Sequence, residues 1–293
     1  MKPPPFAYHA PHTVDEVLAT LAELGDEGKV LAGGQSLVPM LNMRLATPAA
    51  LIDLARVDGL DAIEVTDTHV RVEARVTHER LRRDPRVAAA VPMLRQALDW
   101  VAHPVIRNRG TSVGSIVHAD PAAELPAVLG LLGGHMELAS TTGSRQVAGR
   151  DYVVSPLDSD TAADELALAA VFPRPAPNTG TAFLELARRH GDYALAGVGA
   201  LVTLDDDRRI VHAEVACIGV GGTPVHVTLT DQLAGQAQDA VTLDEAVAAV
   251  RANLKPGDDI HATGAYRVHL TGVLTDRVLR QALAGAIDQE IAA

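Results

Sequence analysis

Hydrophobic and polar positions near the N-terminus follow two periods in turn, first that of a helix and then that of a strand. Thr13 and Glu16 form a capping-box pattern, and the apolar residues after them recur at helical spacing until Gly25. A short apolar run at 29–32 then predicts a strand, and a second strand is expected near 51–54 after a short helical piece. This order predicts a small α/β unit at the start of the chain.

The middle of the chain predicts a second unit built from hairpins and helices. Residues 63–76 alternate between apolar and polar positions, which predicts a hairpin. A helix is expected over 86–102, where Pro104 ends it, and an irregular segment is expected over 105–120. A helix is expected next at 126–132, followed by a hairpin of the strands 136–139 and 145–147. A further strand is expected at 166–172.

A proline-rich stretch at 173–177 separates these segments from a C-terminal part in which strands come first and helices afterwards. The three strands are expected near 181–187, 196–204 and 210–220. Thr242 and Glu245 form a second capping-box pattern for a helix to about residue 254, and a final helix begins near residue 265.

The change of pattern at the prolines predicts two domains, residues 1–175 and 178–293, with the first divided near 55–60. The first domain is expected to consist of two small α/β subdomains. The second is expected to be a three-stranded antiparallel sheet with helices, because strands come first there and helices afterwards. The fold class expected from the sequence is therefore α+β.

Charge and cysteine usage exclude several classes of function. The 293 residues carry a formal net charge of −12 without a dense basic patch, so no nucleic-acid partner is expected. The one cysteine, Cys217, allows neither an internal disulfide nor a cysteine-ligated iron–sulfur or zinc site, and we assign no metal ligands. No apolar run reaches membrane-spanning length and no signal-peptide pattern precedes the first helix, so we expect a cytoplasmic protein without a membrane span.

The most informative stretch is residues 29–48, where an apolar run leads into Gly33 and Gly34 and then into the polar pair Gln35 and Ser36. Glycines lack a Cβ, so several consecutive N–H groups can point into one concavity. Such a concavity suits an anion such as a pyrophosphate. Taken alone, this stretch is a weak signal of phosphate binding.

A second loop of similar character covers residues 109–126. It contains Thr111, Gly114 and Ser115, which can approach phosphate oxygens and bind them, and it ends with the carboxylates Asp120 and Glu124. Carboxylates accept hydrogen bonds from hydroxyl or ring N–H groups, as in the recognition of a ribose or a ribityl chain. The two loops together fit an extended dinucleotide, and the residue types fit two ordinary turns equally well.

Other common motifs are missing from the chain. No P-loop sequence is present, and the pairs Gly197-Val-Gly199 and Gly219-Val-Gly221 lack the third glycine of a Rossmann fingerprint. The segment Gly34-Gln-Ser-Leu-Val38 ends in valine and is therefore not a nucleophile elbow. No residue stands out as a general acid or base for substrate chemistry, which is consistent with an electron-transfer role.

Four motifs in order give the chain a resemblance to the FAD-binding medium subunits of molybdenum hydroxylases, which include the carbon monoxide, nicotine and xanthine dehydrogenase types. Ala32-Gly-Gly-Gln-Ser36 resembles the first flavin loop of that family. Gly110-Thr-Ser-Val-Gly-Ser115, followed by Ala119-Asp-Pro-Ala-Ala-Glu-Leu-Pro126, resembles the second. Arg188-Arg-His-Gly-Asp-Tyr-Ala194 and Tyr266-Arg-Val-His-Leu-Thr-Gly-Val-Leu274 are similar to motifs of the family's C-terminal domain.

The resemblance implies a PCMH/vanillyl-alcohol-oxidase-like FAD-binding domain and a role in electron transfer. In the family, a large partner subunit with a molybdopterin cofactor hydroxylates the substrate, and a small partner subunit passes the electrons on through two 2Fe–2S clusters. The medium subunit holds FAD and delivers electron pairs to an external electron acceptor. The expectation is therefore an FAD-binding subunit within a dimer of heterotrimers, a heterohexamer.

The matched motifs also imply which residues contact FAD. The pyrophosphate would lie on the first loop and on Thr111, Gly114 and Ser115, while Asp120 and Glu124 would lie nearer the ribityl chain and the ring. Leu166 would pack on the flavin. Tyr193 would gate access to the ring. The alternative is that Tyr193 is a buried aromatic residue at the domain interface. The expected cofactor-binding residues are Leu31, Ala32, Gly33, Gly34, Gln35, Ser36, Leu37, Thr111, Gly114, Ser115, Ala119, Asp120, Glu124, Leu166 and Tyr193.

Three residues depart from the family pattern. Val113 stands where the family usually has glycine, Ser115 where many members have asparagine, and Glu185 about where a lysine often occurs. Because a β-branched residue resists positive φ, a slightly different loop backbone is expected at Val113. No lysine contact with the flavin carries over. Two other functions stay open: a self-contained FAD-dependent oxidase, and a flavin-free scaffold subunit, which only Val113 favours.

Overall fold

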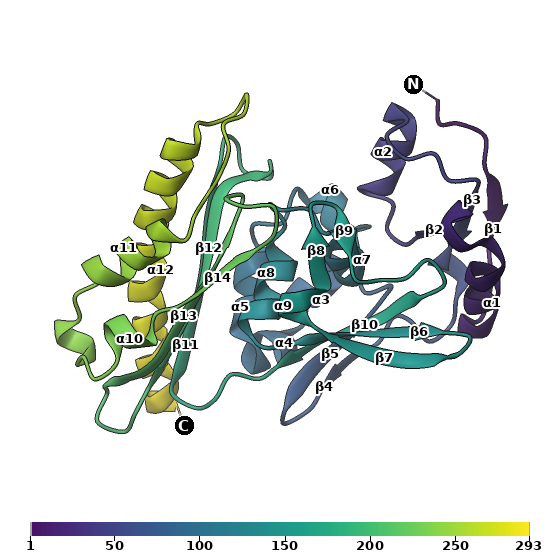
Figure 1. Cartoon of the computed structure of the whole chain (residues 1–293). Helices are drawn as coiled ribbons and strands as arrows, with labels where there is room; N and C mark the ends of the chain where they lie inside the picture. The colour runs from purple at the N-terminus through teal and green to yellow at the C-terminus, as the bar shows by residue number, and fades with distance from the viewer. Residues whose placement is uncertain (1, 293) are drawn as a thin grey trace.

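The structure is a computed structural model that describes residues 2–292, with side chains described for residues 2–286. Its strands form sheets of three, five, four and two strands. Figure 1 shows the three-stranded sheet at one end of the molecule and the four-stranded sheet with the long C-terminal helix at the other. The five-stranded sheet and most of the short helices lie between them.

The N-terminal subdomain is built on a parallel sheet of strand order β1-β3-β2. Its elements are β1 (Ala7–His9), α1 (Val14–Leu24), η1 (Gly25–Glu27), β2 (Gly28–Leu31), α2 (Leu37–Met43), β3 (Ala50–Asp53) and η2 (Leu54–Arg56). The capping box is present, because the Thr13 hydroxyl accepts from the Glu16 N–H and the Glu16 carboxylate accepts from the Thr13 N–H. The expected helix, short helical piece and two strands are confirmed.

The second subdomain is an antiparallel five-stranded sheet of order β4-β5-β10-β6-β7, accompanied by short helices. Its strands are β4 (Ile63–Val65), β5 (His69–Glu73), β6 (His135–Ser140), β7 (Gly143–Ala148), β8 (Val153–Ser155), β9 (Asp158–Ser159) and β10 (Leu166–Pro173). Its helices are α3 (His78–Arg83), α4 (Pro85–Ala90), α5 (Pro92–Leu98), α6 (Pro104–Arg107), α7 (Ser112–His118), α8 (Glu124–Leu131) and α9 (Gly149–Tyr152). The structure confirms both expected hairpins. It also confirms the expected strand at 166–172, which is β10, and the expected helix at 126–132, which corresponds to α8.

Two expectations for this subdomain are wrong. The single helix over 86–102 is divided into α4 and α5 at Val91, whose φ of −138° is not helical. Pro92 disfavours a helical conformation in the residue before it, and it then occupies the first turn of α5. The segment 105–120 is not irregular either, because it contains most of α6 and all of α7.

The C-terminal domain is an antiparallel sheet of order β11-β12-β13-β14 with helices. Its elements are β11 (Thr179–Ala187), β12 (Ala194–Leu204), β13 (Ile210–Ile218), β14 (Val225–Thr228), α10 (Thr230–Leu233), η3 (Gln238–Ala240), α11 (Asp244–Ala252) and α12 (Gly264–Ala292). The sheet therefore has four strands and not the expected three, because β14 is too short to show an alternating pattern. The second capping box is also absent, since α11 has no side-chain cap and the Thr242 N–H donates to the Gln236 side chain at 2.9 Å.

The four-stranded sheet is covered on both faces, and this fixes the two domains against each other. Helix α12 packs along β11 and β12, while α5 and α8 of the second subdomain pack on β11, β12 and β13. Gln96 of α5 donates to the Thr181 carbonyl at 3.0 Å and accepts from the Thr181 hydroxyl at 3.2 Å. The Gly219 N–H donates to the Pro121 carbonyl at 2.9 Å. The last contact joins the C-terminal domain directly to the loop before α8.

Candidate functional site

A cleft of about 1360 Å³ opens between the N-terminal subdomain, helix α7 and the C-terminal domain. Ordinary ligand pockets measure roughly 300–1,000 Å³, so this cleft has room for a dinucleotide. Its walls come from segments that are far apart in the sequence. The main contributors are 32–37, 110–124, 157–167, 188–195, 219–222 and 255–267.

The two glycine-bearing loops meet at Gly33. A Cβ on Gly33 would lie 2.2 Å from the Arg109 carbonyl oxygen and 2.7 Å from the Gly110 Cα, so the backbone would have to move to admit any side chain. A Cβ on Gly114 would lie 2.6 Å from the Thr111 hydroxyl oxygen. The absence of a Cβ at Gly33 therefore allows the first loop to pack against the second. The sequence had suggested instead that this glycine allows a ligand to approach the backbone.

The first loop presents hydrogen-bond donors that the described residues leave unused. Gly34 turns the chain between β2 and α2 with a φ of +72°, which glycine adopts without strain. The N–H groups of Gln35, Ser36 and Leu37 and the Ser36 hydroxyl have no hydrogen-bond partner within residues 2–286. The Gln35 side chain turns back and donates to the Gly33 carbonyl at 3.2 Å. This set of free donors at the start of α2 suits an anionic group.

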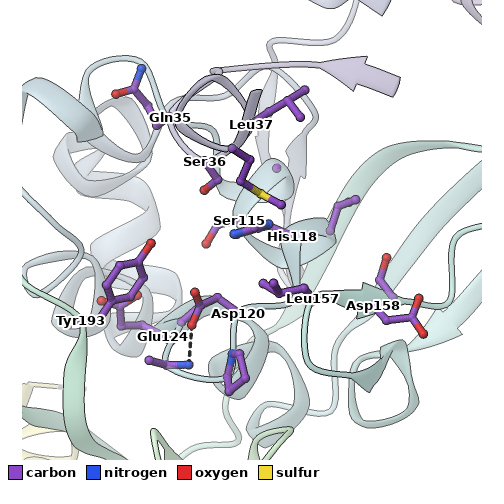
Figure 2. A pocket seen from close by; sticks show the side chains of 18 of the residues that line it. Gln35, Ser36, Leu37, Ser115, His118, Asp120, Glu124, Leu157, Asp158 and Tyr193 are labelled. Carbon is purple, nitrogen blue, oxygen red and sulfur yellow. Dashed lines mark hydrogen bonds between the residues drawn. The ribbon is translucent and has the colours of Figure 1, made fainter. Parts of the chain in front are cut away.

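The second loop uses most of its own polar atoms. The Thr111 hydroxyl caps α7 by accepting from the Gly114 N–H at 3.1 Å, and the Asp120 carboxylate accepts from the Ala122 N–H at 2.8 Å. The Ser115 hydroxyl has no partner among the described side chains and backbone groups. Figure 2 shows Ser36 of the first loop and Ser115 of the second pointing into the same space.

The floor of the cleft carries two carboxyl groups, Asp120 and Glu124, and burial raises the pKa of the second into the neutral range. Glu124 begins α8 and lines the cleft; burial raises its pKa to about 7, and the charge of Asp120 adds to the effect. Glu185 lies behind it on β11 and does not line the cleft. Burial raises the pKa of Glu185 to about 9, with the charge of Glu124 adding to the effect.

Tyr193 is exposed, not buried, which overturns the alternative of a buried aromatic at the domain interface. The residue is 71% exposed, and its side chain lies at the cleft beside Glu124 (Figure 2). The segment that carries it packs on the first domain at Gly191, where a Cβ would lie 2.4 Å from the His103 ring. Contacts between the two domains therefore hold this tyrosine at the mouth of the cleft.

Two of the residues expected to bind the cofactor do not line the cleft. Leu31 ends β2 and points its side chain toward Gly34, with its Cδ1 3.3 Å from the position of a Cβ there. Ala119 is fully buried with a φ of +55°, and its carbonyl accepts from the Leu157 N–H at 2.9 Å. The others all line it: Ala32, Gly33, Gly34, Gln35, Ser36, Leu37, Thr111, Gly114, Ser115, Asp120, Glu124, Leu166 and Tyr193.

Val113 does not strain the second loop. It lies in the first turn of α7 with a helical backbone, and its side chain is buried in the core. A β-branched residue meets no penalty from a positive φ at this place. The one sequence feature that favoured a flavin-free scaffold therefore does not disturb the cleft.

Part of the cleft wall lies outside the residues that were expected to bind the cofactor. His118 of α7 and Leu157 of the β8–β9 turn point into the space between the loops (Figure 2), and Asp158, the first residue of β9, also lines the cleft. Burial lowers the pKa of His118, which keeps its ring neutral at physiological pH. Leu157 has a φ of +63°, an uncommon conformation for leucine, and no glycine marked this turn. The C-terminal domain adds Lys255 at the rim.

These features define a class of protein. Two turns from separate subdomains face each other across a large cleft, and one of them offers free N–H and hydroxyl donors. Within residues 2–286, no group of three or more histidine, cysteine, aspartate or glutamate side chains is placed to hold a metal ion. No helix in the described part of the chain is long and apolar enough to cross a membrane. The arrangement is that of a nucleotide-cofactor protein.

Comparison with known proteins identifies the family. Residues 4–175 match the FAD binding domain in molybdopterin dehydrogenase, and residues 181–282 match the CO dehydrogenase flavoprotein C-terminal domain. The chain therefore belongs to the family of FAD-binding medium subunits of molybdenum hydroxylases of the CO dehydrogenase type. This confirms the resemblance drawn from the four motifs and makes the chain a subunit of an oxidoreductase.

Relatives match the chain over nearly its whole length. It is 36% identical to the 6-hydroxypseudooxynicotine dehydrogenase complex subunit alpha of Paenarthrobacter nicotinovorans, over 97% of this chain and 96% of that one. Its structure matches CO dehydrogenase from Oligotropha carboxidovorans with a TM-score of 0.92 and 34% identity, covering 97% of this chain and 100% of that one. Quinoline 2-oxidoreductase from Pseudomonas putida 86 matches with a TM-score of 0.91 and 37% identity, covering 98% of this chain and 99% of that one. These matches confirm the expected α+β fold class, with an FAD-binding domain followed by a C-terminal domain.

Proposed function

We propose that this chain binds one FAD in the cleft and passes electrons from iron–sulfur clusters of a partner subunit through that FAD to an external acceptor. The observation that carries the proposal is the meeting of the two loops. Gly33 packs on the backbone of Arg109 and Gly110, and the free donors of the first loop and of Ser115 face one space of dinucleotide size.

The residues of the cleft fit an FAD molecule. The N–H groups of Gln35, Ser36 and Leu37 with the Ser36 and Ser115 hydroxyls would hold the pyrophosphate, because these donors have no other partner within the described residues. When bound, FAD supplies the redox chemistry that converts one-electron into two-electron transfer. The protein's part is to bind and orient it, with Leu166 in the wall and Tyr193 at the opening.

The partners belong to the same proposal. We propose a large molybdopterin subunit and a small subunit with two 2Fe–2S clusters, assembled as a dimer of heterotrimers. The support is that relatives over the full length carry names such as dehydrogenase complex subunit alpha and carbon monoxide dehydrogenase medium chain. We further propose that the chain divides into domains at 1–175 and 178–293, with the prolines of 173–177 as the link.

The test is to purify the full chain, alone and together with its neighbouring gene products, and to record the absorption spectrum. The proposal expects one FAD per chain and reduction of that FAD when the iron–sulfur subunit is reduced. A colourless chain in a complete complex contradicts the proposal and favours the flavin-free scaffold. Oxidation of an organic substrate by the isolated chain contradicts it in a different way, because it favours the self-contained oxidase.

A further inference from the structure

Glu185 is a carboxyl group buried without a hydrogen-bond partner. Its side chain is on β11, the residue is 5% exposed, and its Oε2 atom is fully buried with no partner within residues 2–286. In the β11–β12 ladder it faces Gly197, where a Cβ would lie 3.0 Å from the Glu185 Cβ. An isolated buried carboxylate is costly, so a group in this place keeps its proton.

The titratable group that acts on Glu185 is Glu124, a second acid. Glu124 stands at the N-terminus of α8 and lines the cleft, with Asp120 and Tyr193 beside it (Figure 2). Because two nearby carboxyl groups cannot both ionise cheaply, the charge of Glu124 raises the pKa of Glu185 further. The proton of the pair therefore resides on Glu185, the more deeply buried member.

No base or cation on the other neighbouring elements offsets these acids. Strand β12 carries no titratable side chain, and Arg95 of α5 is exposed at the surface. Arg267 of α12 is already engaged, because its guanidinium donates to two backbone carbonyls and to the Asp259 carboxylate. Glu124 thus faces the cleft and Glu185 lies behind it, and neither pKa shift includes an offsetting contribution from a cation.

We propose that Glu185 stores a proton behind the cleft floor and delivers it through Glu124 when a flavin bound in the cleft is reduced. This inference rests on the proposed function. Two electrons come from the one-electron iron–sulfur carriers of the partner subunit, and one proton comes from Glu124, whose O–H bond breaks as an N–H bond forms on the flavin ring. Glu185 then reprotonates Glu124, and a hydronium ion from the solvent returns one proton to Glu185, so both carboxyl groups end as they began. Glu185 acts through Glu124 and is a positioning residue, not a catalytic one.

The first experiment measures, from pH 6 to 10 in the complete complex, the rate at which the reduced iron–sulfur subunit reduces bound FAD. The wild type is expected to keep its rate until the pH passes about 9, where the stored proton is lost. In Glu185→Gln the rate is expected to fall already as the pH passes about 7, where Glu124 ionises, and in Glu124→Gln it is low throughout. Glu64→Gln, which removes an exposed carboxylate on β4, is the matched control and keeps the wild-type profile.

The second experiment needs no bound FAD, and its main measurement is made on the wild-type chain. The infrared spectrum of the full wild-type chain at pH 8 is expected to show the carbonyl band of a protonated carboxylic acid, and this band disappears as the pH rises through about 9. In Glu185→Gln the band is missing at pH 8, whereas the Glu64→Gln control retains it. Absence of the band from the wild type overturns the stored proton.

The two proposals fail in different ways. Superimposable rate profiles for the wild type and Glu185→Gln, each with a full complement of FAD, overturn the proton-delivery role and leave the FAD-binding function intact. A wild-type complex that contains no FAD overturns the proposed function, and the delivery role falls with it even if the infrared band is present.

Discussion

The two loops that face each other across the cleft have similar compositions but opposite hydrogen-bond arrangements. In the first loop, the N–H groups of Gln35 to Leu37 and the Ser36 hydroxyl find no acceptor in the described part of the chain. In the second loop, Thr111 and Asp120 use their side-chain oxygens on N–H groups of their own segment. The first loop is therefore arranged to bind, and the second is arranged to keep its shape.

The charged residues of the two loops also differ, in a way that agrees with their hydrogen bonds. No charged residue lies between Lys29 and Arg44, whereas the second loop runs into Asp120 and Glu124, with Glu185 behind them. An anionic group fits the first loop, and a group that donates hydrogen bonds fits the end of the second. Two loops of similar composition can therefore have different roles. The hydrogen-bond donors and acceptors that each loop leaves free show which role it has.

The broadest effect, on both stability and FAD content, is expected where the loops touch. In Gly33→Val the new side chain collides with the backbone of Arg109 and Gly110, so the loops separate. We expect the unfolding free energy to fall by about 3 kcal/mol, at the upper end for overpacking, and FAD to be lost on purification. Gly257→Val, where a Cβ meets nothing within 4 Å, is the control on the same cleft. Normal FAD content in Gly33→Val would show that the loops need not touch.

Glu185, which lies on β11 behind the acidic end of the second loop, predicts a pH dependence that the first loop lacks. The pKa of Glu185 rises from 4.5 to about 9 on folding, so the folded chain holds a proton that the unfolded chain releases. Wild-type stability therefore falls as the pH rises from about 4.5 to 9, by up to about 1.4 kcal/mol per pH unit from this group.

Glu185→Gln cannot ionise and escapes this loss of stability. Urea unfolding of the cofactor-free chain at pH 5, 7 and 9 measures it, with Glu64→Gln as the control. The stability difference between wild type and Glu185→Gln is expected to grow in favour of the variant as the pH rises. A difference that is independent of pH would mean that Glu185 is ionised in the folded chain.

A smaller effect is expected from the cap of α7. Thr111→Ala removes the acceptor for the Gly114 N–H and should lower the unfolding free energy by about 1 kcal/mol. Thr111→Ser keeps the hydroxyl and should behave like the wild type. Thermal unfolding of the cofactor-free chain distinguishes them. If Thr111→Ala weakens FAD binding but leaves stability unchanged, the second loop would be a binding loop and not a shape-keeping one.

The smallest effects are expected from the free hydroxyl groups. Ser36→Ala and Ser115→Ala should each weaken FAD binding by about 1 kcal/mol, because one hydrogen bond to the cofactor is lost. Neither hydroxyl has a partner in the described protein, so the stability of the cofactor-free chain should stay within about 0.5 kcal/mol of the wild type. Fluorescence titration with FAD and thermal unfolding measure the two quantities. A loss of stability without a loss of affinity would contradict the comparison.

Sequence reasoning succeeded where the signal is local. The capping box of Thr13 and Glu16, the apolar face of α1 and the alternation in the hairpins are set by residues a few positions apart. It failed where a proline or a short strand changed the outcome: Pro92 divides a helix at Val91, and β14 has four residues, too few to show a period. The Thr242 pattern was lost to a partner in the preceding segment, the Gln236 side chain, which accepts the Thr242 N–H.

The candidate site shows the same division. The motifs located both loops, and most of the residues matched to them line one cleft. Ala119 carried a motif position but is buried, because its left-handed backbone ends α7 and its carbonyl binds the Leu157 N–H. Leu157 and Lys255 gave no signal, since no short-range pattern records which distant segment will form a wall.

By itself, the sequence determined the family, most of the regular elements and the two glycine-bearing loops. Residue type and spacing suffice for these, because they depend on local backbone conformation and on motifs that are contiguous in the chain. Only the tertiary structure decided that Gly33 serves contact between the loops, that Thr111 is engaged in a cap, and that Glu185 lies buried behind Glu124. Burial and hydrogen-bond partners come from segments far apart in the chain, and they set which polar groups stay free to act.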